Sequence, residues 1–363
     1  MEKQSKDRIL SIDLLRFFAA TAVMLYHYVF MFTQRGYTTY NYDLLLNTTQ
    51  YGYLGVDLFF IISGFVITMS ANKRTLWQFA TSRIARLYPI YWSSVIITSI
   101  FIYFFGNKID TTINLKVFLT NMTMIPSVFR QPYVDGSYWS LTVELTFYIF
   151  IGLLLLINKY QYLEKITTPL SFILVLGAYL KIIPFNWISY FLAGITFYFI
   201  YKTGVTKLRA LSLLTNLISS IIYATYRAPG LSDNYHTNFN TEIILIYIIS
   251  FYILFLLISI KIIDKLINKI TNSKTKNFLF TLGSLTFPIY LLHQTIGHIF
   301  LRCLERVNLP NLSPLIITSL FIISLSFVLT ILIENRSRNI IFKLSDKLKD
   351  ILYRQSSQKP FST

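Results

Sequence analysis

Apolar side chains occur along this chain in long runs separated by polar connections, a pattern typical of membrane-spanning helices. The runs cover residues 9–32, 51–71, 87–105, 138–157, 168–183, 187–202, 208–227, 241–262, 279–301 and 313–335. They predict an all-α polytopic integral membrane protein with about ten transmembrane helices. The fifth and sixth runs are short enough to be tilted, broken or partly re-entrant.

Basic residues are distributed unevenly between the connections. Of the 33 Lys and Arg residues, 24 lie in one alternating set of connections and 8 in the other, while Arg16 lies inside the first run. The richer set is 1–8, 72–86, 158–167, 202–209, 261–277 and 336–363. Positive charge favours the cytoplasmic side, so both termini are expected in the cytoplasm.

Composition supports this interpretation: 54% of the residues are hydrophobic, 13% are charged, and the net charge is +17. Topology explains the excess charge, so we expect no nucleic-acid partner. The first run carries Arg16 and has no cleavage site, so no cleavable signal is expected. A single cysteine, Cys303, and no HExxH-type histidine spacing argue against a metal site. The expected organisation is a transmembrane domain over 1–335 and a basic cytoplasmic tail over 336–363.

The first run contains residues that a membrane helix rarely carries. A charged side chain near the bilayer centre costs at least ~3 kcal/mol and usually faces a protein interior or an aqueous site. Arg16 and His27 are eleven residues apart. That spacing places them on one helix face, roughly 16 Å apart along the axis. Asp13 falls on the same face, one turn before Arg16.

Counting residues from the ends of the runs sorts the buried polar side chains into two layers. His27, Asp57, Glu144 and His293, from four different runs, come out at a similar depth in an outer layer. Arg16 and Asp13 lie in the inner third, and Arg83 and Arg86 precede the third run on the cytoplasmic side. The sequence therefore predicts an inner basic cluster and an outer cluster of carboxylates and imidazoles.

This arrangement suits a long ligand with an anionic head and a reactive end. Guanidinium groups bind phosphate through paired, charge-assisted hydrogen bonds. A histidine beside a carboxylate suits removal of a proton from a hydroxyl group. Acyl-coenzyme A has the required shape, with phosphates at one end and a thioester at the other.

Five motifs, in order along nearly the whole chain, carry a resemblance to a known family. They are Ile12–Arg16 with His27 after ten further residues, Gly55–Phe65, Arg83–Pro89, Tyr138–Glu144 and Tyr290–His293. In this order they resemble the membrane-bound acyltransferase 3 family, which modifies bacterial surface glycans and related acceptors. One departure is that Leu14 and Phe17 stand where glycines often flank the first-motif arginine.

The resemblance implies a role for each motif. His27 is the expected catalytic base or transient acyl carrier, with Glu144 orienting or charge-balancing its imidazole. Donor binding, with acetyl-CoA as the expected donor and no metal, is assigned to Arg16, Arg83 and Arg86. Acceptor binding or support of the site is assigned to Asp13, Asp57, Tyr138, Trp139, Ser140 and His293. The implied acceptor is a lipid-linked sugar or a surface glycan such as lipopolysaccharide O-antigen or exopolysaccharide, and the implied location is the bacterial plasma (inner) membrane.

Simpler interpretations stay open at several of these positions. A transporter or flippase for a glycan or anionic solute also suits ten spans with buried ionisable residues. Arg16 could neutralise Asp13, and Asp57 could cap a helix or pair with nearby tyrosines. His298 and His236 are expected at the surface. Ser63 and Gly64 more often permit close helix packing than form a nucleophile elbow.

Overall fold

The computed structural model describes residues 9–40, 42–180, 187–307, 309–310 and 312–357, and within these ranges it is helical with no strand. The α-helices are α1 (Leu10–Leu25), α2 (Phe32–Gln34), α3 (Asp43–Thr49), α4 (Gly55–Ala71), α5 (Leu76–Phe105), α6 (Leu115–Asn121), α7 (Trp139–Leu156), α8 (Leu163–Tyr179), α9 (Trp187–Thr203), α10 (Lys207–Tyr235), α11 (Thr241–Ser259), α12 (Ile262–Ile270), α13 (Ser273–Leu304), α14 (Ser313–Leu329) and α15 (Asn335–Ser357). Two π-helical segments, Tyr26–Met31 and Thr330–Glu334, join α1 to α2 and α14 to α15.

Seven helical segments in the described ranges are long and apolar enough to cross a membrane, so the chain is a multi-pass membrane protein. They are Leu10–Gln34, Asp43–Ala71, Leu76–Lys108, Gly136–Leu156, Lys207–Tyr235, Thr241–Ser259 and Ser313–Ile351. The other three expected spans coincide with α8, α9 and α13, although residues 181–183 of the first lie outside the described ranges. The count of ten spans and the cytoplasmic termini therefore stay predictions.

Length and polarity explain why these three helices fall short. The helices α8 and α9 each have 17 residues, at the lower limit for a span. The helix α13 has 32 residues, but His293, Gln294 and His298 interrupt its apolar sequence. Polar side chains in the middle of a membrane helix must be covered by neighbouring helices.

Two expected connections are helical instead. The helix α5 begins at Leu76, after a capping box between Thr75 and Gln78, so Arg83 and Arg86 lie on a helix rather than in a loop over 72–86. The helix α10 continues to Tyr235, so Arg227 is inside a helix and not at the start of a loop over 227–240. Charged residues ended the apolar runs in the sequence, but a helix can continue through them where the charge finds a partner.

The helix α4 lies at the centre of the bundle and packs very closely against α9. A Cβ atom at Gly64 would lie 2.2 Å from the carbonyl oxygen of Phe191, and one at Gly194 would lie 2.2 Å from that of Ile61. Larger residues would hold the two backbones apart, so the expectation that Gly64 serves close packing is confirmed.

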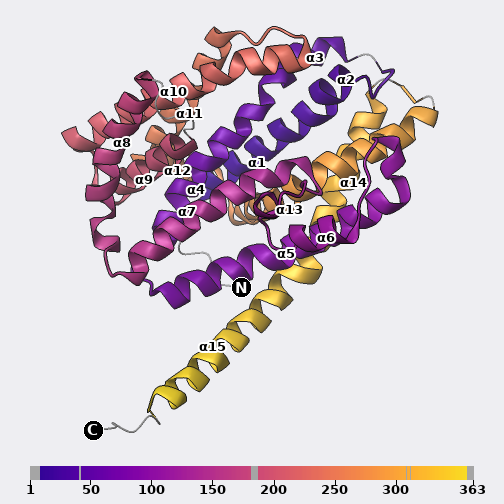
Figure 1. Ribbon diagram of the computed structural model, residues 1–363. Helices are drawn as coiled ribbons and strands as arrows, with labels where there is room; N and C mark the ends of the chain where they lie inside the picture. Colours follow the sequence, from indigo (N-terminus) through magenta and orange to yellow (C-terminus); the bar gives the residue numbers. More distant parts are fainter. Residues whose placement is uncertain (1–8, 41, 181–186, 308, 311, 358–363) are drawn as a thin grey trace.

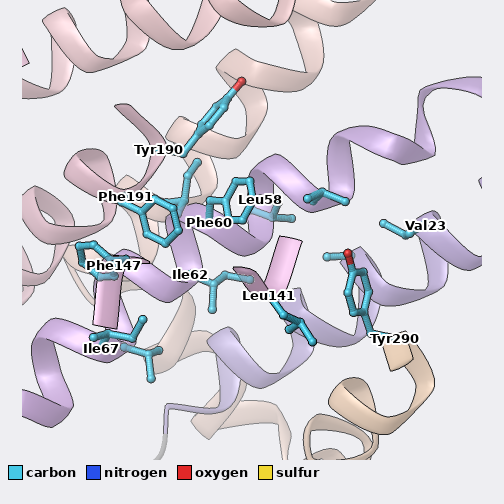
Figure 2. Close-up of a cluster of buried hydrophobic side chains, with 14 of the residues drawn as sticks. Val23, Leu58, Phe60, Ile62, Ile67, Leu141, Phe147, Tyr190, Phe191 and Tyr290 are labelled. Carbon is cyan, nitrogen blue, oxygen red and sulfur yellow. The ribbon is translucent and has the colours of Figure 1, made fainter. Parts of the chain in front are cut away.

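The core around α4 joins helices that are distant in the sequence. Figure 2 shows side chains of α1, α4, α7, α9 and α13 in one apolar cluster, including Val23, Phe60, Leu141 and Tyr290. The rings of Phe147 and Phe191 are stacked with centroids 4.6 Å apart. This packing fixes the relative positions of the helices that carry the predicted site residues.

The C-terminal helix α15 extends away from the bundle (Figure 1, yellow). Its side is held to α5 by a 2.9 Å hydrogen bond between the hydroxyls of Ser345 and Thr81. The residues of the predicted basic tail that the structure describes, such as Arg338 and Lys347, lie on this helix. The structure leaves the division at 335 and the side of the membrane as predictions.

Candidate active site

His27 lies in the π-helical turn Tyr26–Met31 that follows α1. Short π-helical insertions are rare and often occur at functional sites. The His27 side chain is partly exposed, whereas Tyr26 and Tyr28 on either side are buried. Its Nδ1 atom is 3.1 Å from the sulfur of Met31. Because a thioether sulfur is a weak acceptor, this contact places a proton on Nδ1, and in the neutral ring Nε2 then carries the lone pair.

Two further histidines from α13 surround His27. The ring centroids of His293 and His298 are 5.0 Å and 6.1 Å from that of His27. His298 is buried, and its Nε2 donates to the carbonyl oxygen of His27 at 2.9 Å. His298 therefore belongs to this cluster, and the expectation that it lies at the surface is wrong. A helix end estimated from hydropathy placed it too near the outer edge.

The contacts of His293 fix which of its nitrogens carries the proton. Its Nδ1 is 2.7 Å from the carbonyl oxygen of Tyr290, which can only accept a hydrogen bond, so Nδ1 is the donor. In the neutral ring, Nε2 then carries a lone pair, and among the described residues this buried atom has no hydrogen-bond partner. His27 and His293 thus form an adjacent pair in which the Nε2 atoms are suited to accept a proton.

Tyr28 and Gly297 hold α13 against the π-helical turn. The Tyr28 hydroxyl donates to the carbonyl oxygen of His293 at 2.9 Å. Gly297 leaves room for this ring, because a Cβ atom there would lie 2.3 Å from Cε1 of Tyr28. The close approach brings the His27 and His293 rings together.

The predicted basic residues form a second group. Arg16 is within electrostatic range of Asp13, Glu144 and Arg86. Both Arg16 and Glu144 are partly exposed, and Arg86 is exposed. This arrangement agrees with the expectation that Arg16 gathers with basic residues from the start of the third span. The exposed parts of Arg16 and Arg86 are accessible to an anion.

Glu144 belongs to this second group and not to the histidine cluster. It accepts hydrogen bonds from Ser63 at 2.9 Å and from Tyr148 at 2.8 Å. Among the described contacts none joins Glu144 to His27, so the role of Glu144 in orienting the imidazole stays a prediction. The ring of Tyr148 also lies 5.9 Å from the guanidinium carbon of Arg83. Arg83 and Tyr148 line a largely apolar groove of about 580 Å³ between α5 and α7.

Asp57 lies in a third, closed environment. It is fully buried, forms an ion pair with Arg227, and accepts from the Tyr190 hydroxyl at 3.2 Å. The guanidinium group of Arg227 also lies 4.5 Å from the centroid of the Tyr223 ring. These contacts match the pairing interpretation of Asp57 and bring it to neither of the other two groups.

The residues at the start of α7 pack against neighbouring helices. Tyr138 is fully buried with its ring centroid 5.2 Å from that of Tyr91, so its face is covered by protein and not open to a sugar. Trp139 is partly exposed beside Trp187, at 5.3 Å between centroids. Ser140 shares a 2.7 Å hydrogen bond with the Tyr290 hydroxyl and so links α7 to α13.

Sequence reasoning missed His298, Arg227 and Asp135. His298 lies five residues after His293, and Arg227 stands at the end of an apolar run, so both carried a signal. Asp135 lies in a polar connection, where nothing in the local sequence marks it as buried. The structure shows it fully buried against α13.

Fold and site together define a class: a multi-pass helical membrane protein with a histidine cluster, in which His27 is partly exposed, and a separate group of arginines. The sequence profile of an acyltransferase domain matches residues 9–333, which is most of the chain. The chain therefore belongs to the acyltransferase 3 family, as the five motifs indicated. No solved structure matches it.

Curated relatives are similar over part of the chain. An uncharacterized protein of Haemophilus influenzae is 34% identical over 35% of this chain and 60% of its own length. The acyltransferase MdmB of Streptomyces mycarofaciens is 29% identical over 39% of this chain and 38% of its own length. The exopolysaccharide production protein ExoZ of Rhizobium meliloti is 30% identical over 30% of this chain and 37% of its own length. The chain thus spans between about a third and three fifths of the lengths of these relatives.

Proposed function

We propose that this protein is a membrane O-acyltransferase that transfers an acyl group, acetyl being the expected one, from acyl-CoA to a hydroxyl of a cell-surface glycan. The observation that carries the proposal is the partly exposed His27 beside His293, with the Nε2 atoms of both rings suited to accept a proton. Membership of the acyltransferase family supports the reaction class, and the name of the exopolysaccharide relative supports a glycan acceptor.

In the proposed reaction, Nε2 of His27 accepts the proton of the acceptor hydroxyl. The hydroxyl oxygen attacks the thioester carbonyl, the carbon–sulfur bond breaks, and the proton passes from the imidazolium to the departing thiolate. A neutral imidazole suits this role because the same nitrogen can accept and return the proton near neutral pH. His293 lies close enough to share the developing charge.

Arg16 and Arg86 are assigned to the donor phosphates, with Arg83 beside them. Arg16 lies about 16 Å from His27 along the helix axis, so the reactive end of an extended donor could approach the histidines while its anionic end stays with the arginines. Glu144 is assigned to Arg16 rather than to the imidazole, since its described partners are Ser63 and Tyr148. Glu144 would hold the guanidinium group of Arg16 in place after one donor molecule has left and before the next one binds.

The deciding experiment measures transfer of isotopically labelled acetyl from acetyl-CoA to surface glycan in membranes carrying the native protein, His27→Ala or no protein. We expect a labelled mass increment with the native protein only, and a rate for His27→Ala lower by about 10²–10⁴-fold, the usual contribution of a general base. His236→Ala is the matched control, because His236 ends α10 and is not among the described partners of His27.

Equal labelling with native and His27→Ala protein at equal expression would overturn the assignment of the base. If the native protein adds no labelled increment, and cells without the protein lose glycan export, a transporter would be favoured instead.

A further inference from the structure

Asp135 is a buried carboxylate that the proposed reaction leaves without a role. It precedes the short 3-10 helix Gly136–Tyr138 and is fully buried. One carboxylate oxygen accepts from the backbone N–H of Ser137 at 2.9 Å and from its hydroxyl at 2.6 Å. The other accepts from the backbone N–H of Thr295 at 2.7 Å.

The bond to Thr295 crosses from the α7 connection to the interior of α13. An N–H inside a helix normally bonds to the carbonyl four residues earlier, so donation to a distant side chain is uncommon. Thr295 lies two residues after His293 and three before His298. Asp135 therefore acts on the turn of α13 that carries both histidines of the site.

Hydrogen bonds fasten this turn on two sides. Toward the α7 connection, the Tyr290 hydroxyl donates to the carbonyl of Ser137 at 3.2 Å, beside the Asp135–Thr295 bond. Toward the π-helical turn, Tyr28 donates to the carbonyl of His293 and His298 donates to the carbonyl of His27, both at 2.9 Å. The His293 ring is bonded to the Tyr290 carbonyl within the same turn, so it moves with the backbone.

The charge of Asp135 also acts on the site. Its described hydrogen-bond partners are neutral donors, and it is in neither of the ion pairs that the described residues form. The carboxylate is within electrostatic range of His293. A fixed negative charge in a buried site stabilises positive charge that develops nearby during reaction.

We propose that Asp135 is a positioning residue for the His27–His293 pair, holding the α13 turn so that the two rings stay together and balancing the charge that forms on them. This inference rests on the proposed acyl transfer for its catalytic part, while the positioning itself can be tested without it.

A simpler role for Asp135 is to cap the 3-10 helix through Ser137. Asp135→Asn separates the two roles, because the amide oxygen can keep accepting from Ser137 while the amide NH₂ group then meets the Thr295 N–H, donor against donor. Asn121→Ala is the matched control. Asn121 is fully buried and accepts from the Val134 N–H at 3.0 Å, so it holds the same connection, and none of its described hydrogen bonds reaches α13.

Two measurements are made on purified protein in nanodiscs: the kcat and KM of acetyl transfer, and the diethyl pyrocarbonate modification rates of His27 and His293 by mass spectrometry. For Asp135→Asn we expect kcat to fall about 10–100-fold with KM for acetyl-CoA changed less than about twofold, since a misplacement near 1 Å costs about 10²-fold. His293, buried in the native protein, should be modified faster. Asn121→Ala should lower the Tm and leave His293 protected.

Native kcat and native modification rates in Asp135→Asn would reduce Asp135 to a helix cap and overturn the proposal. A fall in kcat without faster modification of His293 would overturn the positioning role and leave only the balancing of charge. If Asp135→Asn does not fold, Asp135→Glu retains the charge but is longer by one methylene, and the same two readouts apply. If the native protein transfers no acyl group, the proposed function fails, and the modification rates alone decide the positioning role.

Discussion

The histidine cluster and the Asp57–Arg227 pair are both polar groups inside an apolar bundle, yet they differ in how their charge is balanced. The histidines bond to backbone carbonyls and keep one partly exposed member, His27. Asp57 is fully buried, and Arg227 covers it together with the rings of Tyr53 and Tyr223. The first arrangement leaves lone pairs for chemistry, and the second sets a buried carboxylate against an opposite charge.

The difference shows that a buried ionisable residue in a membrane helix does not by itself mark a reaction site. Burial at similar depth made Asp57 and His27 look equivalent in the sequence. What separates them is whether a neighbouring helix supplies an opposite charge. An ion pair braces helices, whereas a neutral base with an unoccupied lone pair can react.

The largest expected change in stability comes from removing one partner of the Asp57–Arg227 ion pair. Arg227→Gln leaves Asp57 buried without its counter-charge, which should lower the free energy of unfolding by about 3–5 kcal/mol. Chemical denaturation in detergent micelles measures it, with transfer per folded molecule as a second readout. Because the pair is a brace, we expect that second value to stay near native.

The double variant Asp57→Leu/Arg227→Met serves as the control. Replacing both partners with apolar residues removes the unpaired charge, so much of the lost stability should return. If the double variant is as unstable as Arg227→Gln, the unpaired charge of Asp57 is not the cause of the lost stability.

An intermediate effect is expected from Gly297→Ala, because the added methyl group should push α13 away from the π-helical turn that carries His27. The added Cβ would meet the Tyr28 ring at 2.3 Å, and such overpacking costs about 1–3 kcal/mol. Displacement of Tyr28 should also lower the transfer rate, measured as kcat. Gly230→Ala is the control, because no atom lies within 4 Å of a Cβ at that helical position. It should be neutral or stabilising by roughly 0.5–1 kcal/mol.

The smallest effect should come from Tyr28→Phe, which removes one hydroxyl and keeps the ring. Loss of the bond to the His293 carbonyl should cost about 0.5–1.5 kcal/mol. Thermal unfolding of Tyr28→Phe is compared with that of Tyr226→Phe, because Tyr226 is 74% exposed in the native protein. Equal Tm values for both variants and the native protein would show that this hydroxyl does not fasten α13.

Much of the architecture could be predicted from the sequence. Long apolar runs predicted the helical membrane protein, and the motif order predicted the family that the profile match shows. The placement of Arg16 and His27 on one helix face stays a prediction, because His27 lies in a π-helical turn whose period differs from that of an α-helix. Helix boundaries at Arg83 and Arg227 were wrong, because hydropathy does not tell where a charged residue continues a helix.

What the sequence determined by itself was therefore local: which segments are apolar, which faces carry polar side chains, and which motifs occur in order. The tertiary structure decided the partners. It placed Glu144 with Arg16, Asp57 with Arg227, and His298 and Asp135 with the α13 turn beside His27. The physical reason is that a helix fixes the direction of its own side chains, whereas the helix that meets them depends on packing between segments up to 271 residues apart.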